Sequence, residues 1–287
     1  MIDLHTHTTY SDGTSTPREL VAHAAAVGLR AVAITDHDTV EGVEEALEAG
    51  RELGIEVVPG VEINLEHHQV TMDLLGYFLA GCPTAELREQ LTELRAYRDE
   101  RNARILDRLA ELGYPIDPEE LAAIGEHGAI GRPHIAEALR RRGYATSIAE
   151  AFERFLRRGA PAWVDRRRLS LSQAVRSLRA SGGLPVIAHP GIIRTDEAGL
   201  ATIAREAARA GVVGLECYYP AHDRATVARV LGLCERLALV PTGGSDFHGA
   251  VKPQNDLGIG ACGEPVPDKV LDDLRCLAES VGPARVH

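Results

Sequence analysis

Short apolar runs alternate with helical patterns along most of this 287-residue chain. The apolar runs predict strands at 2–4, 31–35, 56–63, 70–78, 185–189, 211–216 and 239–243. Helices are predicted at about 17–27, 40–53, 171–181, 197–210, 222–237 and 268–280. Strand–helix alternation of this kind is typical of a parallel sheet covered by helices, and the number of strands suits a closed or nearly closed barrel. We therefore expect an α/β barrel.

Residues 98–168 interrupt this alternation. They predict consecutive helices, separated by turn signals at Gly113-Tyr114-Pro115 and between residues 128 and 133. We therefore expect a discontinuous barrel domain, residues 1–97 and 169–287, with a small helical insertion at 98–168 that covers the active site.

The composition disfavours several classes of protein. Apolar residues make up 45% and charged residues 25% of the chain, as in an ordinary soluble domain. No run approaches the roughly 18–20 apolar residues of a membrane span. Because the first strand starts at Ile2, we expect no signal peptide and a cytoplasmic location. The net charge of −11 disfavours binding to long duplex nucleic acid. The five cysteines show no CxxC spacing and are interpreted as free thiols or small apolar residues.

Histidines and carboxylates gather where the predicted strands end. His5 and His7 share one face of the first strand, because residues i and i+2 of a strand point the same way, and Asp246 and His248 repeat this spacing. The candidate ligands are His5, His7, Asp12, His37, Glu62, His189, Asp246 and His248. The carboxyl ends of parallel barrel strands converge on one face, so these side chains are expected to meet there.

The chemical types of these ligands narrow the choice of metal ion. Imidazole and carboxylate without thiolate suit Mn²⁺, Fe²⁺ or Zn²⁺. The donors are too many for one ion. A carboxylate such as Glu62 could bridge two ions about 3.5–4 Å apart, the separation used in two-metal phosphoester hydrolysis.

The motifs HTHTTYSDGT, AITDHDT, PGVEI, AHPG and GGSDFHG resemble those of the PHP (polymerase and histidinol phosphatase) family, in order and over the whole barrel. The inserted segments IGRPHIAEALRRRGY and AFERFLRRGAPAWV are similar to those of the subfamily with 3′,5′-nucleoside bisphosphate phosphatase and 5′→3′ exoribonuclease activity. This resemblance implies a distorted (β/α)7 barrel with two or three bound divalent ions, Mn²⁺ above all.

Motif by motif, the resemblance implies roles for single residues. The first ion would be held by His5, His7, Glu62 and Asp246, the second by Asp12, His37 and His248, and the third by Glu62 and His189. Arg132 and His134 of the insertion would grip a substrate phosphate and take part in catalysis. Arg194 would supply a further positive charge, because some members have an arginine directly after the AHPG glycine.

One position departs from the subfamily pattern. Asp73, in Met72-Asp73-Leu74-Leu75-Gly76-Tyr77, stands where the subfamily usually has a histidine ligand of the third ion. Three alternatives follow: Asp73 is itself a ligand, the third site is vacant, or the nearby His67 or His68 compensates. We predict that Asp73 is a ligand.

Further polar and aromatic residues remain open between two interpretations. His222 is either a general acid or phosphate contact, or a cap of the following helix. Glu216 could orient a ligand imidazole, and Asp36 could either do the same or be a solvent-exposed carboxylate of a turn. Four aromatic residues could stack on a nucleobase or pack in the core, namely Tyr10, Tyr218, Tyr219 and Phe247.

The sequence thus predicts a metal-dependent phosphoesterase that acts on a 3′,5′-nucleoside bisphosphate or trims short RNA, with a metal-bridging hydroxide as nucleophile. Within the enzyme class, the alternatives are a histidinol-phosphatase-like enzyme, which the insertion disfavours, and a cyclic-phosphate dihydrolase, which the change at Asp73 keeps open. A regulatory metal-binding module is the non-enzyme alternative. No obligate protein partner is evident.

Overall fold

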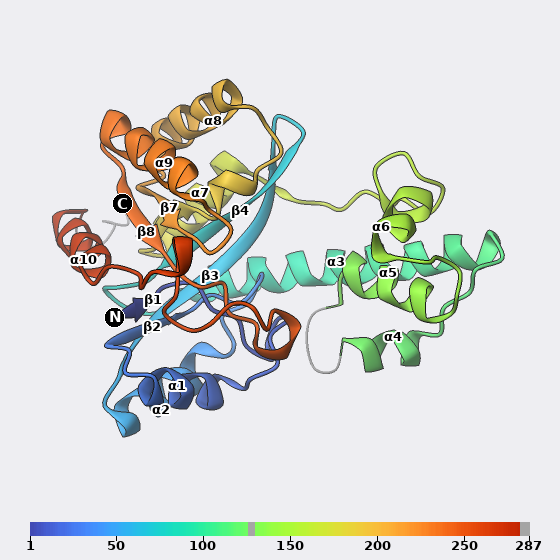
Figure 1. The fold of residues 1–287 in the computed structure, drawn as a ribbon, viewed down its shortest axis with the longest axis horizontal. Helices are drawn as coiled ribbons and strands as arrows, with labels where there is room; N and C mark the ends of the chain where they lie inside the picture. The colour runs from blue at the N-terminus through green and yellow to red at the C-terminus, as the bar shows by residue number, and fades with distance from the viewer. Residues whose placement is uncertain (126–129, 282–287) are drawn as a thin grey trace. The chain divides into compact units, whose positions relative to one another are not determined.

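The computed structural model describes residues 1–125 and 130–281 (Figure 1). The chain forms two compact units, one made of Met1–Gln90 and Arg168–His287 and the other of Leu91–Arg167. The prediction that the second unit covers an active site stays a prediction.

The first unit is built on one sheet in the order β1-β2-β3-β4-β6-β7-β8, with β5 added beside β3. The strands are β1 (Ile2–Asp3), β2 (Ala31–Ile34), β3 (Glu56–His67), β4 (Val70–Tyr77), β5 (Leu169–Ser170), β6 (Leu184–Ile187), β7 (Gly214–Tyr218) and β8 (Val240–Gly243). The two ends of the sheet meet, because the backbone N–H of Leu4 donates to the carbonyl of Gly243 at 3.3 Å. The predicted barrel-like α/β fold is confirmed.

The prediction of an all-parallel sheet is wrong at one strand. β4 runs antiparallel to both of its neighbours, β3 and β6. The reason is the connection before it, because only His68 and Gln69 separate β3 from β4, too few residues for a crossover to a parallel strand. Both take positive φ angles, 49° and 63°, as the central residues of the tight turns that suit β-hairpins do.

Helices flank the sheet in the first unit (Figure 1). They are α1 (Pro17–Ala26), α2 (Val43–Leu53), α7 (Leu171–Ala180), α8 (Glu197–Ala210), α9 (Arg224–Leu237) and α10 (Lys269–Val281). α1 begins at a capping box between Thr16 and Glu19. α2 begins three residues later than predicted, which leaves residues 35–42 as a loop after β2.

Two of the apolar clusters of the first unit join its helices to its strands. One joins Ile2 and Leu4 to residues of β6 and α10, including Val186 and Leu271. The other packs α1 and α2 against β2. These contacts fix the strands whose ends carry the polar side chains described below.

The second unit consists of helices with their own apolar core. They are the later part of α3 (Ala85–Glu111), α4 (Pro118–Ile124), α5 (Arg132–Arg141), α6 (Ile148–Ala151) and a π-helical turn at Phe152–Leu156. Leu109, Ile135 and Leu156 are buried in its core. The helical character predicted for this region is present. Among residues 1–125 and 130–281, no helix combines the length and apolarity needed to span a membrane.

Candidate metal centre

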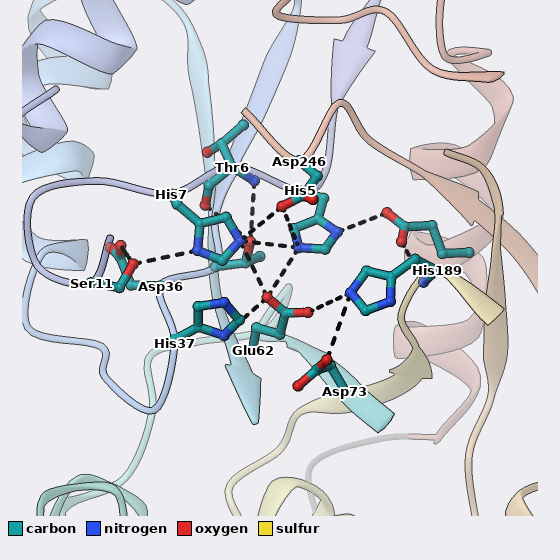
Figure 2. Close-up of polar contacts among 12 residues, drawn as sticks. His5, Thr6, His7, Ser11, Asp36, His37, Glu62, Asp73, His189 and Asp246 are labelled. Carbon is teal, nitrogen blue, oxygen red and sulfur yellow. Dashed lines mark hydrogen bonds and ion pairs between the residues drawn. The ribbon is translucent and has the colours of Figure 1, made fainter. Parts of the chain in front are cut away.

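His5 and His7 follow β1 and are completely buried. Their segment runs beside the chain that follows β8, because the backbone N–H of His7 donates to the carbonyl of Phe247 at 2.9 Å. Residues i and i+2 of an extended segment point to the same side, and the Nε2 atoms of the two rings lie 3.1 Å apart. The two imidazoles thus face one point (Figure 2).

Two carboxylates complete a four-donor group around these rings. Glu62 Oε2 lies 3.2 Å from the Nε2 atoms of both His5 and His7. Asp246 Oδ1 lies 3.6 Å from His5 Nε2 and 3.4 Å from His7 Nε2. Ligand atoms about 2.0–2.1 Å from a tetrahedral ion are about 3.3 Å from one another. The donor separations therefore fit a divalent transition-metal ion.

Glu62 lies between two parts of the site. Its Oε2 atom also lies 3.2 Å from His37 Nδ1, while its Oε1 atom lies 3.0 Å from His189 Nε2. Burial alone would raise the pKa of Glu62, but the charges of His37 and His5 hold it well below its ordinary value. A carboxylate whose two oxygens face different imidazoles has the geometry of a ligand that bridges two ions.

Asp12 lies at the centre of a second group of donors. Its Oδ1 atom lies 3.2 Å from His248 Nε2, and its Oδ2 atom lies 3.9 Å from His37 Nε2. His7 also belongs to this group, with Nδ1 3.7 Å from Asp12 Oδ1. Burial opposes the charge of Asp12, but His37 and His248 lower its pKa. The group fits a second cation next to the first.

Asp73 lies at the third edge of the cluster, in one group with His37 and Glu62. Its Oδ2 atom lies 3.8 Å from His189 Nε2 (Figure 2). Asn64, its cross-strand partner in the β3–β4 hairpin, donates to Asp73 Oδ1 at 2.8 Å. Burial, together with the negative charge of Glu62, raises the pKa of Asp73. A cation here would relieve the repulsion between these two carboxylates.

Glu216 orients two of the candidate ligands. Its Oε1 atom accepts a hydrogen bond from His5 Nδ1 at 2.9 Å, so the Nε2 atom of that ring faces the cluster. Its Oε2 atom accepts from the backbone N–H of His189 at 2.7 Å. Asp36 instead fixes the loop that follows His7. It accepts hydrogen bonds from the backbone N–H of Thr8 at 2.7 Å and from the hydroxyl of Ser11. The Ser11 hydroxyl lies 3.3 Å from His7 Nδ1.

Replacing Glu216 with glutamine is expected to lower the affinity for divalent metal by about 10–100-fold, the usual effect of losing a carboxylate that orients a ligand histidine. The amide keeps the volume, but its NH₂ group would face a donor on either His5 or His189. Calorimetric titration of metal-free protein with Mn²⁺ measures the change. The exposed Glu235, changed to glutamine, is the control and should bind Mn²⁺ like the unchanged chain. Equal affinities for all three chains would contradict the orienting role.

Asp246 is held by contacts that motif spacing does not reveal. Lys252 Nζ lies 2.6 Å from its Oδ2 atom, which also accepts from the hydroxyl of Tyr219 at 3.0 Å. Asp246, His189 and Asp38 all have positive φ angles, 53°, 28° and 53°. Such conformations are costly for residues other than glycine and tend to occur at functional sites.

His222 is bonded like a structural residue. Its Nδ1 atom donates to the carbonyl of Cys217, and its Nε2 atom accepts from the backbone N–H of Gly191, each at 3.0 Å. Burial lowers its pKa, which favours the neutral ring. Asp223, not His222, caps α9. These contacts leave neither nitrogen for a substrate, so they do not support the predicted role as general acid.

Several of the other predicted residues make contacts of their own. His67 and His68 pair with Glu206, which disfavours their compensating at the third site. Arg194 is exposed. In the second unit, Arg132 stacks on the Trp163 ring at 4.6 Å, and His134 Nδ1 accepts from the backbone N–H at the start of α5. The phosphate-binding roles of Arg132, His134 and Arg194 stay predictions.

Comparisons with known proteins identify the family of the chain. The PHP domain model matches residues 3–155. The phosphoribosyl 1,2-cyclic phosphate 1,2-diphosphodiesterase of Eggerthella lenta is 32% identical, covering 86% of this chain and 94% of that protein. The 5′-3′ exoribonuclease Rnm of Escherichia coli is 32% identical over 86% of this chain and 84% of its own. The 3′,5′-nucleoside bisphosphate phosphatase of Chromobacterium violaceum is 29% identical over 90% of both.

Solved structures show the same fold. A Bifidobacterium adolescentis protein assigned as a metal-dependent phosphoesterase is 32% identical, with a TM-score of 0.77 and coverage of 96% of this chain and 95% of that one. An amidohydrolase from Chromobacterium violaceum with bound sulfate is 28% identical, with a TM-score of 0.82 and 96% coverage of both chains. The chain therefore belongs to the PHP domain family, and it is a metal-dependent phosphoesterase.

Proposed function

We propose that the protein hydrolyses a phosphate ester of a small nucleotide, either a 3′,5′-nucleoside bisphosphate or the 5′ end of short RNA. The observation that carries this proposal is the placement of Glu62, whose Oε2 faces His5, His7 and His37 while Oε1 faces His189. Such a carboxylate would hold two cations at the spacing that spans a phosphoester.

The donor groups assign residues to each ion. We propose His5, His7, Glu62 and Asp246 for the first ion, and Asp12, His37 and His248 for the second. Glu62, Asp73 and His189 would hold the third. Imidazole mixed with carboxylate suits Mn²⁺, and also Fe²⁺ or Zn²⁺. When bound, the ions would polarise the phosphoryl oxygens, acidify a water and stabilise the leaving oxygen.

The protein's own part is to position these groups and to bind the substrate. Glu216 and Asp36 fix the ligands on one side of the site through the hydrogen bonds described above. We propose that Arg132, His134 and Arg194 bind substrate phosphates, because a guanidinium presents paired donors that match phosphate oxygens. The names of the Rnm exoribonuclease and of the bisphosphate phosphatase support the nucleotide class.

A cyclic phosphate diester is the second candidate substrate. Two observations favour it: Asp73 lies at the third edge of the cluster, and the Eggerthella lenta relative, named for a ribosyl cyclic phosphate, is covered by this chain over 94% of its length. An extra carboxylate makes the site more negative, which suits a diester, with one negative charge, better than a dianionic monoester.

A three-substrate assay separates the candidates. The Mn²⁺-loaded protein is incubated with adenosine 3′,5′-bisphosphate, a 5′-phosphorylated RNA tetramer and ribose 1,2-cyclic phosphate 5-phosphate, and products are resolved by chromatography. Turnover of the first or second substrate is the expected result. Turnover of the third alone would replace the proposal with the cyclic diester, and turnover of none would refute the nucleotide assignment.

Replacing Asp73 with alanine is expected to lower the number of bound ions by one per chain. The reason is that the third donor group would lose the only carboxylate that it does not share with the first ion. Elemental analysis of Mn²⁺-equilibrated, desalted protein measures the count. The exposed Asp107 on α3, changed to alanine, should leave the count unchanged. An Asp73→Ala chain with the same count as the unchanged protein would mean that Asp73 holds no ion.

A further inference from the structure

A second group of metal-binding side chains lies at the turn of the β3–β4 hairpin, beside α8 (Figure 1). His67 Nε2 lies 2.6 Å and His68 Nε2 lies 2.8 Å from the same oxygen, Oε2 of Glu206. Among the described residues, it is the only such group that shares no residue with the central cluster.

The backbone brings these two adjacent imidazoles to one point. Consecutive residues of a strand point to opposite faces, so two neighbouring histidines do not ordinarily reach the same atom. Here His68 leaves the strand with a φ of 49°, and the two ring centroids lie 4.1 Å apart. A left-handed conformation is unfavourable for histidine relative to the glycine or asparagine that usually occupies such turns.

We propose that His67, His68 and Glu206 form an auxiliary binding site for a divalent transition-metal ion, with Zn²⁺ as the best match. Two imidazole nitrogens and one carboxylate oxygen form a common zinc ligand set, which leaves the fourth position to water. Donors around such an ion are about 3.3 Å apart, so the side chains would separate by about half an ångström. Their exposure, 62% for His68 and 35% for Glu206, permits this movement.

The charge of the group suits a cation. His67 and His68 lower the pKa of Glu206 by their hydrogen bonds, which favours its ionised carboxylate. One divalent ion can accept a lone pair from each of the three donors at once, since their ligand atoms lie within 4.8 Å of one another.

An ion at this position would act on the hairpin that carries Glu62 and Asp73. Glu206 belongs to α8, whereas His67 ends β3 and His68 begins the turn. Metal binding would therefore tie the turn of the hairpin to α8 and stabilise the native state by RT ln(1 + [ion]/Kd), an amount that rises with the logarithm of the ion concentration. This proposal does not depend on which substrate the enzyme hydrolyses, because none of the three residues belongs to the central cluster.

Zinc stoichiometry tests this inference. The unchanged chain, Glu206→Ala and the control Glu197→Ala, which alters another exposed glutamate of α8, are equilibrated with Zn²⁺, desalted and analysed for zinc. We expect one zinc fewer per chain in Glu206→Ala and no change in Glu197→Ala. Equal zinc counts in the three proteins would overturn the site.

A second variant tests whether the loss of zinc from Glu206→Ala is a direct loss of a ligand. His68→Ala removes a ligand that is mostly exposed and should lose the same single zinc ion. Both variants should keep the Mn²⁺-dependent phosphate release of the unchanged chain. A loss of zinc together with a loss of that activity would place the missing ion in the central cluster and overturn the proposal.

Discussion

Replacing Glu62 with glutamine is expected to lower the turnover of the Mn²⁺-loaded protein by at least about a hundredfold. Glu62 is 1% exposed, and each of its oxygens faces different imidazoles. The amide keeps the shape but presents an oxygen to one side and an NH₂ group to the other, so it cannot bridge two cations. Steady-state hydrolysis of the best substrate measures the effect.

A matched substitution on the same strand controls for this change. Glu56 begins β3 and pairs with Arg275 away from the cluster, so Glu56→Gln should retain nearly full turnover. Thermal unfolding of the metal-free proteins shows whether Glu62→Gln is folded. A folded Glu62→Gln protein with turnover within about threefold of the unchanged chain would rule out Glu62 as an essential bridge.

Removing the metal ions is expected to abolish turnover and to lower the melting temperature by about 5–10 °C relative to protein in excess Mn²⁺. Saturation at about 100 times Kd contributes about 2.7 kcal/mol, and each kcal/mol shifts the melting temperature of a domain of this size by about 2–4 °C. Without metal ions, the site must hold the four carboxylates of Asp12, Glu62, Asp73 and Asp246 close together with only the charges of the imidazoles and one lysine to offset them. Burial opposes protonation of His7, yet Asp246 and Glu62 raise its pKa to about 9.

Chelation, dialysis and add-back make this second prediction measurable. Turnover should return when Mn²⁺ is restored and should not return when Mg²⁺ alone is added, because Mg²⁺ takes oxygen ligands and keeps several waters, whereas half or more of the donors here are imidazoles. The Glu62→Gln protein should show a smaller thermal shift than the unchanged chain. Full turnover in metal-free protein, verified by elemental analysis, would contradict the account.

The candidate ligands could be predicted because most of them, such as His5, His37, His189 and Asp246, follow a recognisable strand. Barrel strands end on one face, so residues as distant in sequence as His5 and Asp246 were expected to meet, and their nearest donor atoms lie 3.6 Å apart. Asp73 also lies beside the cluster, although its position departs from the family pattern. The signal came from polar residues at strand ends, which an apolar core does not require.

Other features depend on tertiary contacts that periodicity does not encode. The direction of β4 was predicted wrongly, because His68-Gln69 lacks the asparagine and glycine that usually mark a two-residue hairpin turn. Lys252, which pairs with Asp246, lies in a segment with no motif of its own. Asn64 can donate to Asp73 because the register of the hairpin places the two residues opposite each other, and the sequence does not reveal this register. The contacts of His222 with two backbone groups were equally invisible in the sequence.

The most direct test of the account is to locate the ions. An anomalous difference map from a crystal grown with Mn²⁺, collected at the manganese edge, should show at least two peaks that share Glu62. One peak is expected among His5, His7 and Asp246, and another within about 3.5–4 Å of it. A single peak, or peaks that do not contact Glu62, would contradict the bridged metal centre on which the proposed phosphoesterase mechanism rests.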